Sequence, residues 1–509
     1  MTYKNHLAIS IVKHTYGDLS SSIVESLLTT SHQTLKELMK STSISYQHIN
    51  KPLLALITNN IVLYLEEFAP IPLQTQDTIL IERPKDEEPI STKYFVNIDH
   101  IFLFNRLPKL YDIVRTIAGP EGVVIVETLL QEGRNYKSIL LDRVLHQELS
   151  RRSSVSLDEK NRIQDSLEVA FSKLAENQII WRHSTGGKLV RRGDESVIVE
   201  VPKSKRKRLA QNADQSSKLL RDDIGNDLFP DLNHQEGDVS PMDSQAFSET
   251  YWSLNSNSCL RLFRHGLILS FINQQHGELV HKIFRAFIIC ARGTEPSIKN
   301  RRLGPVAIDS MCAELAELGA NALTMFSAER VGQVFEKLKS LPNSWIEQEG
   351  TLGGGSFVVN ISNIMKILKK RLIQDIITKK FDSFIAGRIY ALLLDNENLE
   401  EKIITELCVC SPTDSRRILH AMLFENYVQT EAKGADKTSN KATFYYSLNK
   451  ESVVTSIIDL AYEGYFKLYA RLQKELKDGS STENLVRLEH SLLSLDDSIL
   501  VLDNFSSFD

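Results

Sequence analysis

The sequence lacks the features that mark secreted, membrane-spanning and disulfide-bonded proteins. It has only five cysteines in 509 residues, in odd number and without a CxxC pair, which is typical of reduced thiols. No window approaches the roughly 18 uninterrupted apolar residues of a membrane span, and residues 1–13 lack the apolar run of a signal peptide. We therefore expect an intracellular protein without a membrane segment.

Signatures of catalysis and of cofactor binding are also missing. No GxSxG, HExxH, phosphate-loop or dinucleotide-binding motif occurs. Cys408 and Cys410 are too close in sequence for the usual zinc spacing. The formal net charge of −5 is near neutral for this length, unlike that of a protein whose whole surface binds nucleic acid. The sequence thus predicts neither an enzyme nor a cofactor or metal protein.

What the sequence does contain is a short phrase that occurs three times, at 56–61, 174–179 and 423–428. In each copy an asparagine (Asn59, Asn177, Asn426) ends an apolar run of helical period just before a β-branched or aromatic run. This is the helix-to-strand junction of a winged helix. Because the second gap between copies is about twice the first, we predict a hidden copy near residues 300–345.

The pattern of apolar residues around these copies predicts a mainly α fold with small β wings. We expect four tandem extended winged-helix domains and a C-terminal helical hairpin or coiled coil. The predicted units are winged helix 1 (1–107), winged helix 2 (108–201), a disordered charged linker (202–248), winged helix 3 (249–380), winged helix 4 (381–449) and the tail (450–509). The tail pattern suits an intramolecular hairpin and equally a pairing with another chain.

Two strands should follow the last helix of each unit. The predicted pairs are 61–65 with 94–98, 179–181 with 197–199, 345–346 with 357–359, and 427–430 with 443–448.

The helices that precede the predicted wings carry little positive charge. Residues 45–59 contain only Lys51, residues 158–177 contain three basic and five acidic side chains, and residues 413–426 are balanced. A helix that reads bases in the major groove needs Lys and Arg for phosphates and Arg, Asn or Gln for bases. We therefore expect these helices to dock on proteins rather than on DNA.

Positive charge is concentrated elsewhere, in two sets. The candidates for nucleic-acid contact are Lys299, Arg301, Arg302, Lys366, Lys369 and Lys370, of which the last three belong to an amphipathic helix with a basic face. A solvated basic face is the alternative interpretation. In the linker, a basic hexapeptide is a nuclear-signal candidate or, alternatively, a solvated charge run; its basic residues are Lys203, Lys205, Arg206, Lys207 and Arg208.

Three stretches, 17–28, 53–62 and 426–446, carry a resemblance to a known family. The layout resembles the peripheral RNA polymerase III subunit with four winged helices and a C-terminal coiled coil, which is related to the large subunit of TFIIE. The resemblance implies a nuclear, non-catalytic subunit that joins two smaller subunits in a heterotrimer on the polymerase clamp. It also implies a role in promoter recruitment and DNA opening, with TFIIIB as a further partner.

Two other functions remain open at this stage. The domains also suit a free-standing DNA-binding transcription regulator with several winged helices, and an assembly protein like the cullins or the proteasome lid. Stable association with a multisubunit polymerase would distinguish the polymerase-subunit function from both alternatives.

Overall fold

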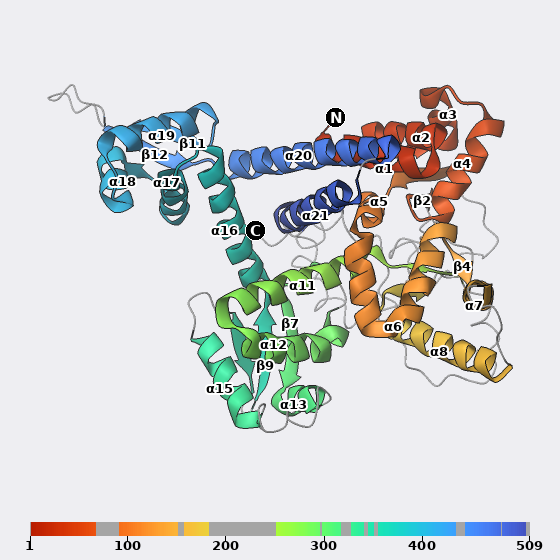
Figure 1. The fold of residues 1–509 in the computed structure, drawn as a ribbon. Coiled ribbons are helices and arrows are strands. Elements are labelled where there is room, and N and C mark those ends of the chain that lie inside the picture. Colours follow the sequence, from red (N-terminus) through yellow and green to blue (C-terminus); the bar gives the residue numbers. More distant parts are fainter. Residues whose placement is uncertain are drawn as a thin grey trace, which may run out of the picture. The chain divides into compact units, whose positions relative to one another are not determined.

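A computed structural model describes most of the chain, and Figure 1 shows its helices and strands. The described residues are 2–67, 91–150, 157–182, 251–295, 298–316, 327–340, 345–350, 355–433, 443–479 and 481–504. Within them the chain divides into two compact units. One unit is formed by Ala8–Cys259, and the other by Thr2–Leu7 together with Leu260–Asp509.

The first unit contains two copies of the same arrangement. The first copy consists of α2 (Asp18–Thr30), β1 (Gln33–Thr34), α3 (Leu35–Thr42), α4 (Tyr46–Thr58), β2 (Val62–Glu67) and β3 (Ser91–Val96). The second consists of the latter half of α6 (Leu107–Glu132), β4 (Asn135–Tyr136), α7 (Lys137–Ser150), α8 (Leu157–Glu176), β5 (Ile180–Arg182) and β6 (Tyr251–Leu254).

The second unit contains two more copies. The third copy consists of α12 (Glu278–Ala291), β7 (Arg302–Ala307), α13 (Ile308–Ala316), α15 (Ala328–Lys339), β8 (Ile346–Glu349) and β9 (Ser356–Asn360). The fourth consists of α17 (Phe384–Asp395), β10 (Leu399–Glu400), α18 (Glu401–Cys408), α19 (Pro412–Phe424), β11 (Val428–Lys433) and β12 (Thr443–Leu448).

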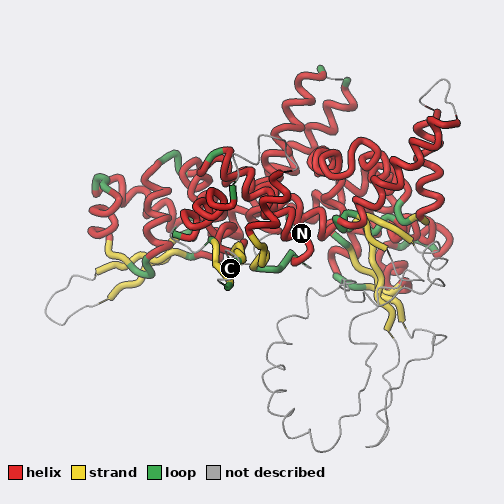
Figure 2. The backbone as a smooth tube through the Cα atoms, turned by 90° about the horizontal axis from the view of Figure 1, so that it is seen from below, coloured by secondary structure: helices red, strands yellow, loops and turns green. Residues whose placement is uncertain are grey.

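All four copies have the same sheet topology. Each antiparallel sheet takes its last strand into the middle, in the orders β1-β3-β2, β4-β6-β5, β7-β9-β8 and β10-β12-β11. Figure 2 shows these short strands beside a chain that is otherwise largely helical. The predicted fold class, mainly α with small β wings, is therefore confirmed.

A linking helix precedes each copy. These helices are α1 (Tyr3–Tyr16), the first half of α6, α11 (Ser256–His276) and α16 (Ile361–Lys380); α5 (Ile98–Leu103) and the 3-10 helix η1 (Phe104–Arg106) lead into α6. The first three end at Gly17, Gly119 and Gly277, whose φ values of 84°, 78° and 83° lie in a region that favours glycine. These glycines allow the chain to turn directly from the linking helix into the first helix of the copy.

The turn after the last helix of a copy has a left-handed residue, but not always the asparagine that the sequence pattern indicated. The left-handed residues are Asn60, Gln178 and Asn426, with φ of 57°, 57° and 59°. The backbone N–H of the next residue then donates to a carbonyl of the preceding helix: Ile61 to Leu56 (2.9 Å), Ile179 to Leu174 (2.9 Å) and Tyr427 to Met422 (2.8 Å). The first two copies are therefore offset by one residue from the alignment on Asn59 and Asn177.

A second asparagine recurs in all four copies, and sequence inspection missed it. Asn97, Asn255 and Asn449 follow the last wing strand and Asn360 is its final residue. Their backbone N–H groups donate to the carbonyls of Ile61, Ile179, Trp345 and Tyr427 at 2.7–2.9 Å. Three of them also cap the next helix with the side chain, which accepts from the backbone of His100, Ser258 and Ser452.

The structure contains the hidden third copy, in which the carbonyl of Trp345 accepts the same backbone hydrogen bond as the carbonyls of Ile61, Ile179 and Tyr427 in the other copies. Its strands β8 and β9 lie where they were predicted. In the second copy, the strand predicted at 197–199 falls outside the described residues, and β5 pairs instead with β6. The boundary drawn at residue 249 therefore differs from the structure, where Tyr251–Leu254 completes the second sheet.

The C-terminal tail folds back on itself and packs against the fourth copy. Helix α20 (Lys450–Asp478) packs against α21 (Thr482–Ile499), with Leu488 and Leu492 among the buried residues. The base of α20 shares a core with α16 and α19 that also takes in Leu502. Asp503 accepts hydrogen bonds from Tyr462 (2.6 Å) and Lys4 (2.7 Å), so the tail forms an intramolecular hairpin.

The capping role of the recurrent asparagine predicts a local effect. Asn449→Ala removes the side-chain bond to the amide of Ser452, so we expect faster hydrogen exchange in the first turn of α20, equivalent to about 1 kcal/mol. Asn360→Ala is the control, because Asn360 keeps the backbone bond while its side chain accepts from the Ser362 hydroxyl (2.8 Å) and caps no backbone N–H of α16. Equal loss of protection at the two helix starts would contradict this role.

Candidate interaction surfaces

The helices that precede the wings, α4, α8, α15 and α19, are the surfaces that a winged helix normally presents to a partner. Their formal net charges lie between −2 for α8 and +1 for the other three. Three of them expose large apolar side chains, namely Tyr46 and Leu54 on α4, Val169 on α8, and Leu423 and Phe424 on α19. Such surfaces suit protein partners better than phosphate groups.

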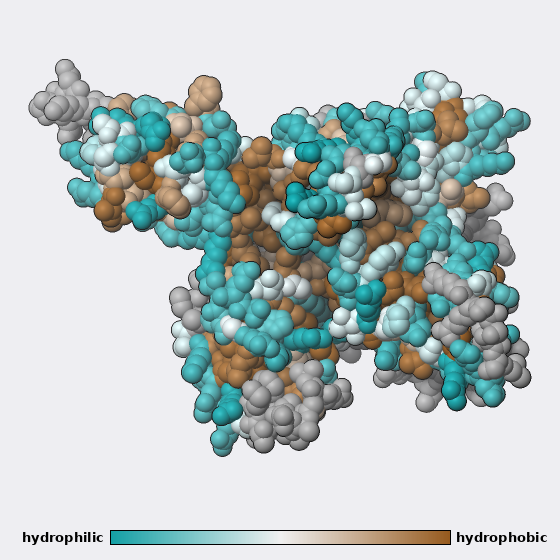
Figure 3. Space-filling model, in the orientation of Figure 1, coloured by the Kyte–Doolittle hydropathy of each residue, from teal (hydrophilic) through white to brown (hydrophobic). Residues whose placement is uncertain are grey.

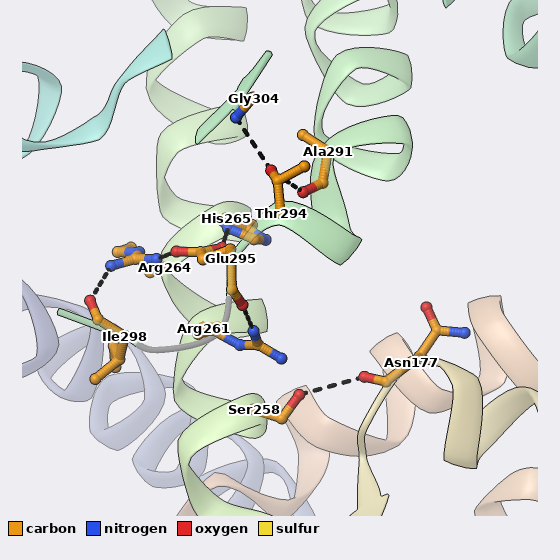
Figure 4. A network of polar contacts seen from close by, with 10 residues as sticks. All are labelled: Asn177, Ser258, Arg261, Arg264, His265, Ala291, Thr294, Glu295, Ile298 and Gly304. Carbon is orange, nitrogen blue, oxygen red and sulfur yellow. Dashed lines mark hydrogen bonds and ion pairs between the residues drawn. The ribbon is translucent and has the colours of Figure 1, made fainter. Parts of the chain in front are cut away.

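A buried charged cluster organises the third copy, and Figure 4 shows it from close by. Arg264 and His265 on α11 both contact the Glu295 carboxylate, His265 through Nε2 at 2.9 Å. Arg261, one turn earlier on α11, donates to the backbone carbonyl of Glu295. Both Arg264 and Glu295 are fully buried. The cluster therefore fixes the segment that follows α12 onto the side of α11.

The electrostatics of the cluster follow from its burial. Burial, with the Arg261 guanidinium nearby, lowers the pKa of Arg264 to about 9, which leaves Arg264 charged at neutral pH. Burial and the guanidinium groups of Arg264, Arg261 and Arg292 keep the pKa of His265 well below its usual 6.5. The neutral imidazole then donates through Nε2 to Glu295, so the carboxylate is balanced mainly by Arg264.

The buried cluster also contacts the chain next to the basic residues Lys299, Arg301 and Arg302. Arg264 Nη1 donates to the carbonyl of Ile298 at 2.5 Å, and Ile298 precedes Lys299. Further on, the backbone N–H of Gly304 donates to Thr294 Oγ1 at 3.2 Å. The candidate loop is thus held at both ends by groups attached to the buried cluster.

Of the loop candidates, Arg301 and Arg302 are exposed and Lys299 is half-buried. Arg302 forms an ion pair with Glu347 at 3.2 Å, and the carbonyl of Arg301 accepts from the backbone of Ser362 at the start of α16. The structure therefore places the loop beside the first turn of α16, the linking helix that carries the second set of candidates.

The predicted basic face of α16 is only partly present. Lys366 is exposed, and Lys370 pairs with Asp395 at 2.7 Å. Lys369, however, is only 8% exposed, which contradicts its placement on a solvated face. It lies on the stripe at spacing four that also contains the buried residues Met365 and Ile373. Its aliphatic stem therefore packs inward, as long cationic side chains often do.

The nuclear-signal candidates, which are the basic residues of 203–208, lie outside the described residues and stay a prediction. Across the described ranges, no three His, Cys, Asp or Glu side chains gather in a way that would hold a metal ion. In the same ranges, no helix has both the length and the apolar character needed to cross a membrane.

Comparison with known proteins bears on the whole chain. Residues 6–67 match the model of the RNA polymerase III subunit RPC82 helix-turn-helix domain, and residues 373–448 match that of the POLR3C C-terminal winged-helix domain. DNA-directed RNA polymerase III subunit RPC3 of Mus musculus is 22% identical and that of Homo sapiens 21% identical, over 95% of this chain and 87% of theirs.

The chain is thus similar to RNA polymerase III subunit RPC3 along nearly its whole length. The protein of that name from Dictyostelium discoideum is 18% identical over 97% of this chain and 95% of its own length. The two domain models fall on most of α1 with the first copy up to β2, and on the fourth copy with the end of α16. Similarity to the RPC3 proteins also covers the second and third copies, where the buried cluster and the basic loop lie.

The buried cluster yields a direct prediction. Glu295→Gln leaves Arg264 buried without its counter-charge, which typically costs about 3 to 5 kcal/mol. We expect a matching loss of stability in urea denaturation of the full chain, followed by the fluorescence of Trp345 after Trp181→Phe and Trp252→Phe. Glu347→Gln is the control, because its exposed pair with Arg302 contributes at most about 1 kcal/mol. Similar losses in both variants would refute a special role for the cluster.

Proposed function

We propose that the chain is a non-catalytic subunit of DNA-directed RNA polymerase III that supports transcription initiation. The observation that carries this proposal is the similarity to RPC3 proteins over 95% of the chain. The fourfold winged helix with a C-terminal hairpin agrees with the architecture implied by the sequence resemblance. The chain would act as a scaffold, because its prominent surfaces are suited to binding other macromolecules.

We propose two smaller subunits, the polymerase clamp and TFIIIB as its partners, in a nuclear complex. The low charge of α4, α8, α15 and α19 supports protein docking, because neutral surfaces are desolvated at little electrostatic cost. The exposed apolar side chains Leu54, Val169 and Phe424 supply area that such partners can cover. The basic hexapeptide at 203–208 is proposed as the nuclear signal.

We further propose that the third copy contacts the DNA backbone without reading its sequence. The support is the exposure of Arg301 and Arg302, and of Lys366 on the adjoining linking helix α16, together with the attachment of the loop to a buried cluster. A loop held in one conformation presents its cations to phosphates without a further ordering penalty.

The subunit assignment is tested by affinity purification of the tagged chain from its own cells, followed by mass spectrometry. We expect the large polymerase subunits to remain bound in high salt, because extensive apolar interfaces are not weakened by screening. Absence of these subunits would overturn the proposal. A monomer that binds a defined duplex site would instead identify a free-standing DNA-binding regulator.

The DNA contact is tested with Arg301→Glu and Arg302→Glu combined, in the assembled complex. If both cations neutralise phosphates, the slope of log Kd against log salt concentration should decrease by about 2. The control combines Lys467→Glu and Arg487→Glu on the hairpin, which changes the net charge by the same amount. An unchanged slope for the loop variant, or an equal change for the control, would count against the contact.

A further inference from the structure

The end of α18 combines backbone strain with exposure. Val409 closes this helix in the left-handed conformation, with φ 49° and ψ 57°. That conformation is unfavourable for a β-branched residue, and helices that end in this way usually have glycine there. Burial of the side chain could offset the strain, but Val409 is 82% exposed. Strain that is retained without a structural benefit points to a use of the side chain outside the chain itself.

The equivalent position in the first copy makes the contrast clear. Helix α3, the counterpart of α18, also ends in a left-handed residue, Ser43, with φ 56°. Ser43 is small, polar and exposed, so it adds no apolar surface. The fourth copy thus has a large apolar side chain at a position where the same fold accepts a small polar one.

Three further apolar side chains on α17 and α18 are exposed, as Val409 is. Ile403 and Leu407 are one turn apart on α18 and are 41% and 58% exposed. Phe384 on α17 is 83% exposed, and Arg388, one turn later, donates to the carbonyl of Cys408 at 3.1 Å. That bond brings this face of α17 to the end of α18.

We name Phe384, Ile403, Leu407 and Val409 the α18 patch. Figure 3 shows apolar residues exposed among polar ones on the fourth copy, where Figure 1 labels α17 and α18.

The charges around the patch narrow the choice of occupant. Residues 381–411 contain six acidic side chains and two basic ones, and two of the acidic side chains, Asp395 and Glu401, are paired with Lys370 and Arg416, which leaves a formal net of −2. One of the basic side chains, Arg388, already binds the Cys408 carbonyl. A phosphate backbone would be repelled by this rim, and a second copy of the chain would bring two acidic rims together. A partner with cations around an apolar stripe matches both features.

We propose that the α18 patch docks an amphipathic helix of another protein, whose apolar face is flanked by lysine or arginine. The apolar side chains of that helix would cover Phe384, Leu407 and Val409, while its cations would face the acidic rim. This proposal rests on the fourth copy alone and adds a docking surface whichever assembly the chain enters.

The occupant is identified by photo-cross-linking in the complex as it exists in cells. The full chain carries p-benzoylphenylalanine at position 407, and the cross-linked peptide is sequenced after purification. We expect a segment with net positive charge and apolar residues three and four apart. A control label at Val486, 63% exposed on α21, should not reach the same segment. No adduct, or an adduct with DNA, a second copy or an acidic segment, would overturn the proposal.

The cross-linking experiment tests the α18 patch independently of the proposed polymerase function. A basic amphipathic segment from a protein outside the polymerase would support the α18 patch while contradicting the proposed polymerase function. Recovery of polymerase subunits without an adduct at position 407 would support the polymerase function and contradict the α18 patch.

The strain itself supplies a second test. Val409→Gly relieves the backbone, so the melting temperature of the free chain should rise or stay unchanged. Affinity for a synthetic peptide of the cross-linked segment, measured by fluorescence anisotropy, should fall by about five- to tenfold, because apolar contact is lost. Ser43→Gly makes the same backbone change in the first copy and should leave the affinity unaltered. Unchanged affinity for Val409→Gly, or a lower melting temperature, would contradict the use of this side chain.

Discussion

One buried carbonyl group in each copy holds the winged helix together. The carbonyls of Ile61, Ile179, Trp345 and Tyr427 accept the backbone N–H of the asparagine that follows the wing. In three copies the N–H of the same residue also closes the end of the preceding helix. A buried carbonyl without a partner would cost about 1 to 3 kcal/mol. A single residue thus joins a helix, a wing strand and the next linking helix, and the rest of each copy is arranged around it.

This junction explains how much of the fold could be predicted. The apolar residue after the helix is under strong physical constraint, so three copies stood out in the sequence and the fourth could be inferred from their spacing. The exact left-handed residue was less visible, because Asn59 and Asn60 are adjacent and Gln178 replaces asparagine. The strands β1, β4 and β10 span two residues each, too few to show an alternating pattern.

The interaction surfaces were harder to predict, for reasons that differ from case to case. Lys369 belongs to a basic run in the sequence, and only the helix spacing from Met365 to Ile373 reveals that it points inward. The contacts of Glu295 join residues about thirty positions apart, which a single sequence does not disclose. The strain at Val409 is a property of the backbone and leaves no mark on composition. Similarity to the RPC3 proteins bears on the chain as a whole, whereas these local features are visible only in the structure.

The wings differ greatly in length although the sheets are alike. The chain between the paired strands is residues 350–355 in the third copy and 183–250 in the second, a roughly elevenfold difference that raises the entropy of loop closure by only about 2 kcal/mol. A connection between paired strands can therefore gain residues at little cost to the folding of the sheet. The basic hexapeptide lies between the two paired strands of the second copy in the sequence. If it is the proposed nuclear signal, that signal could be gained or lost without changing the paired strands.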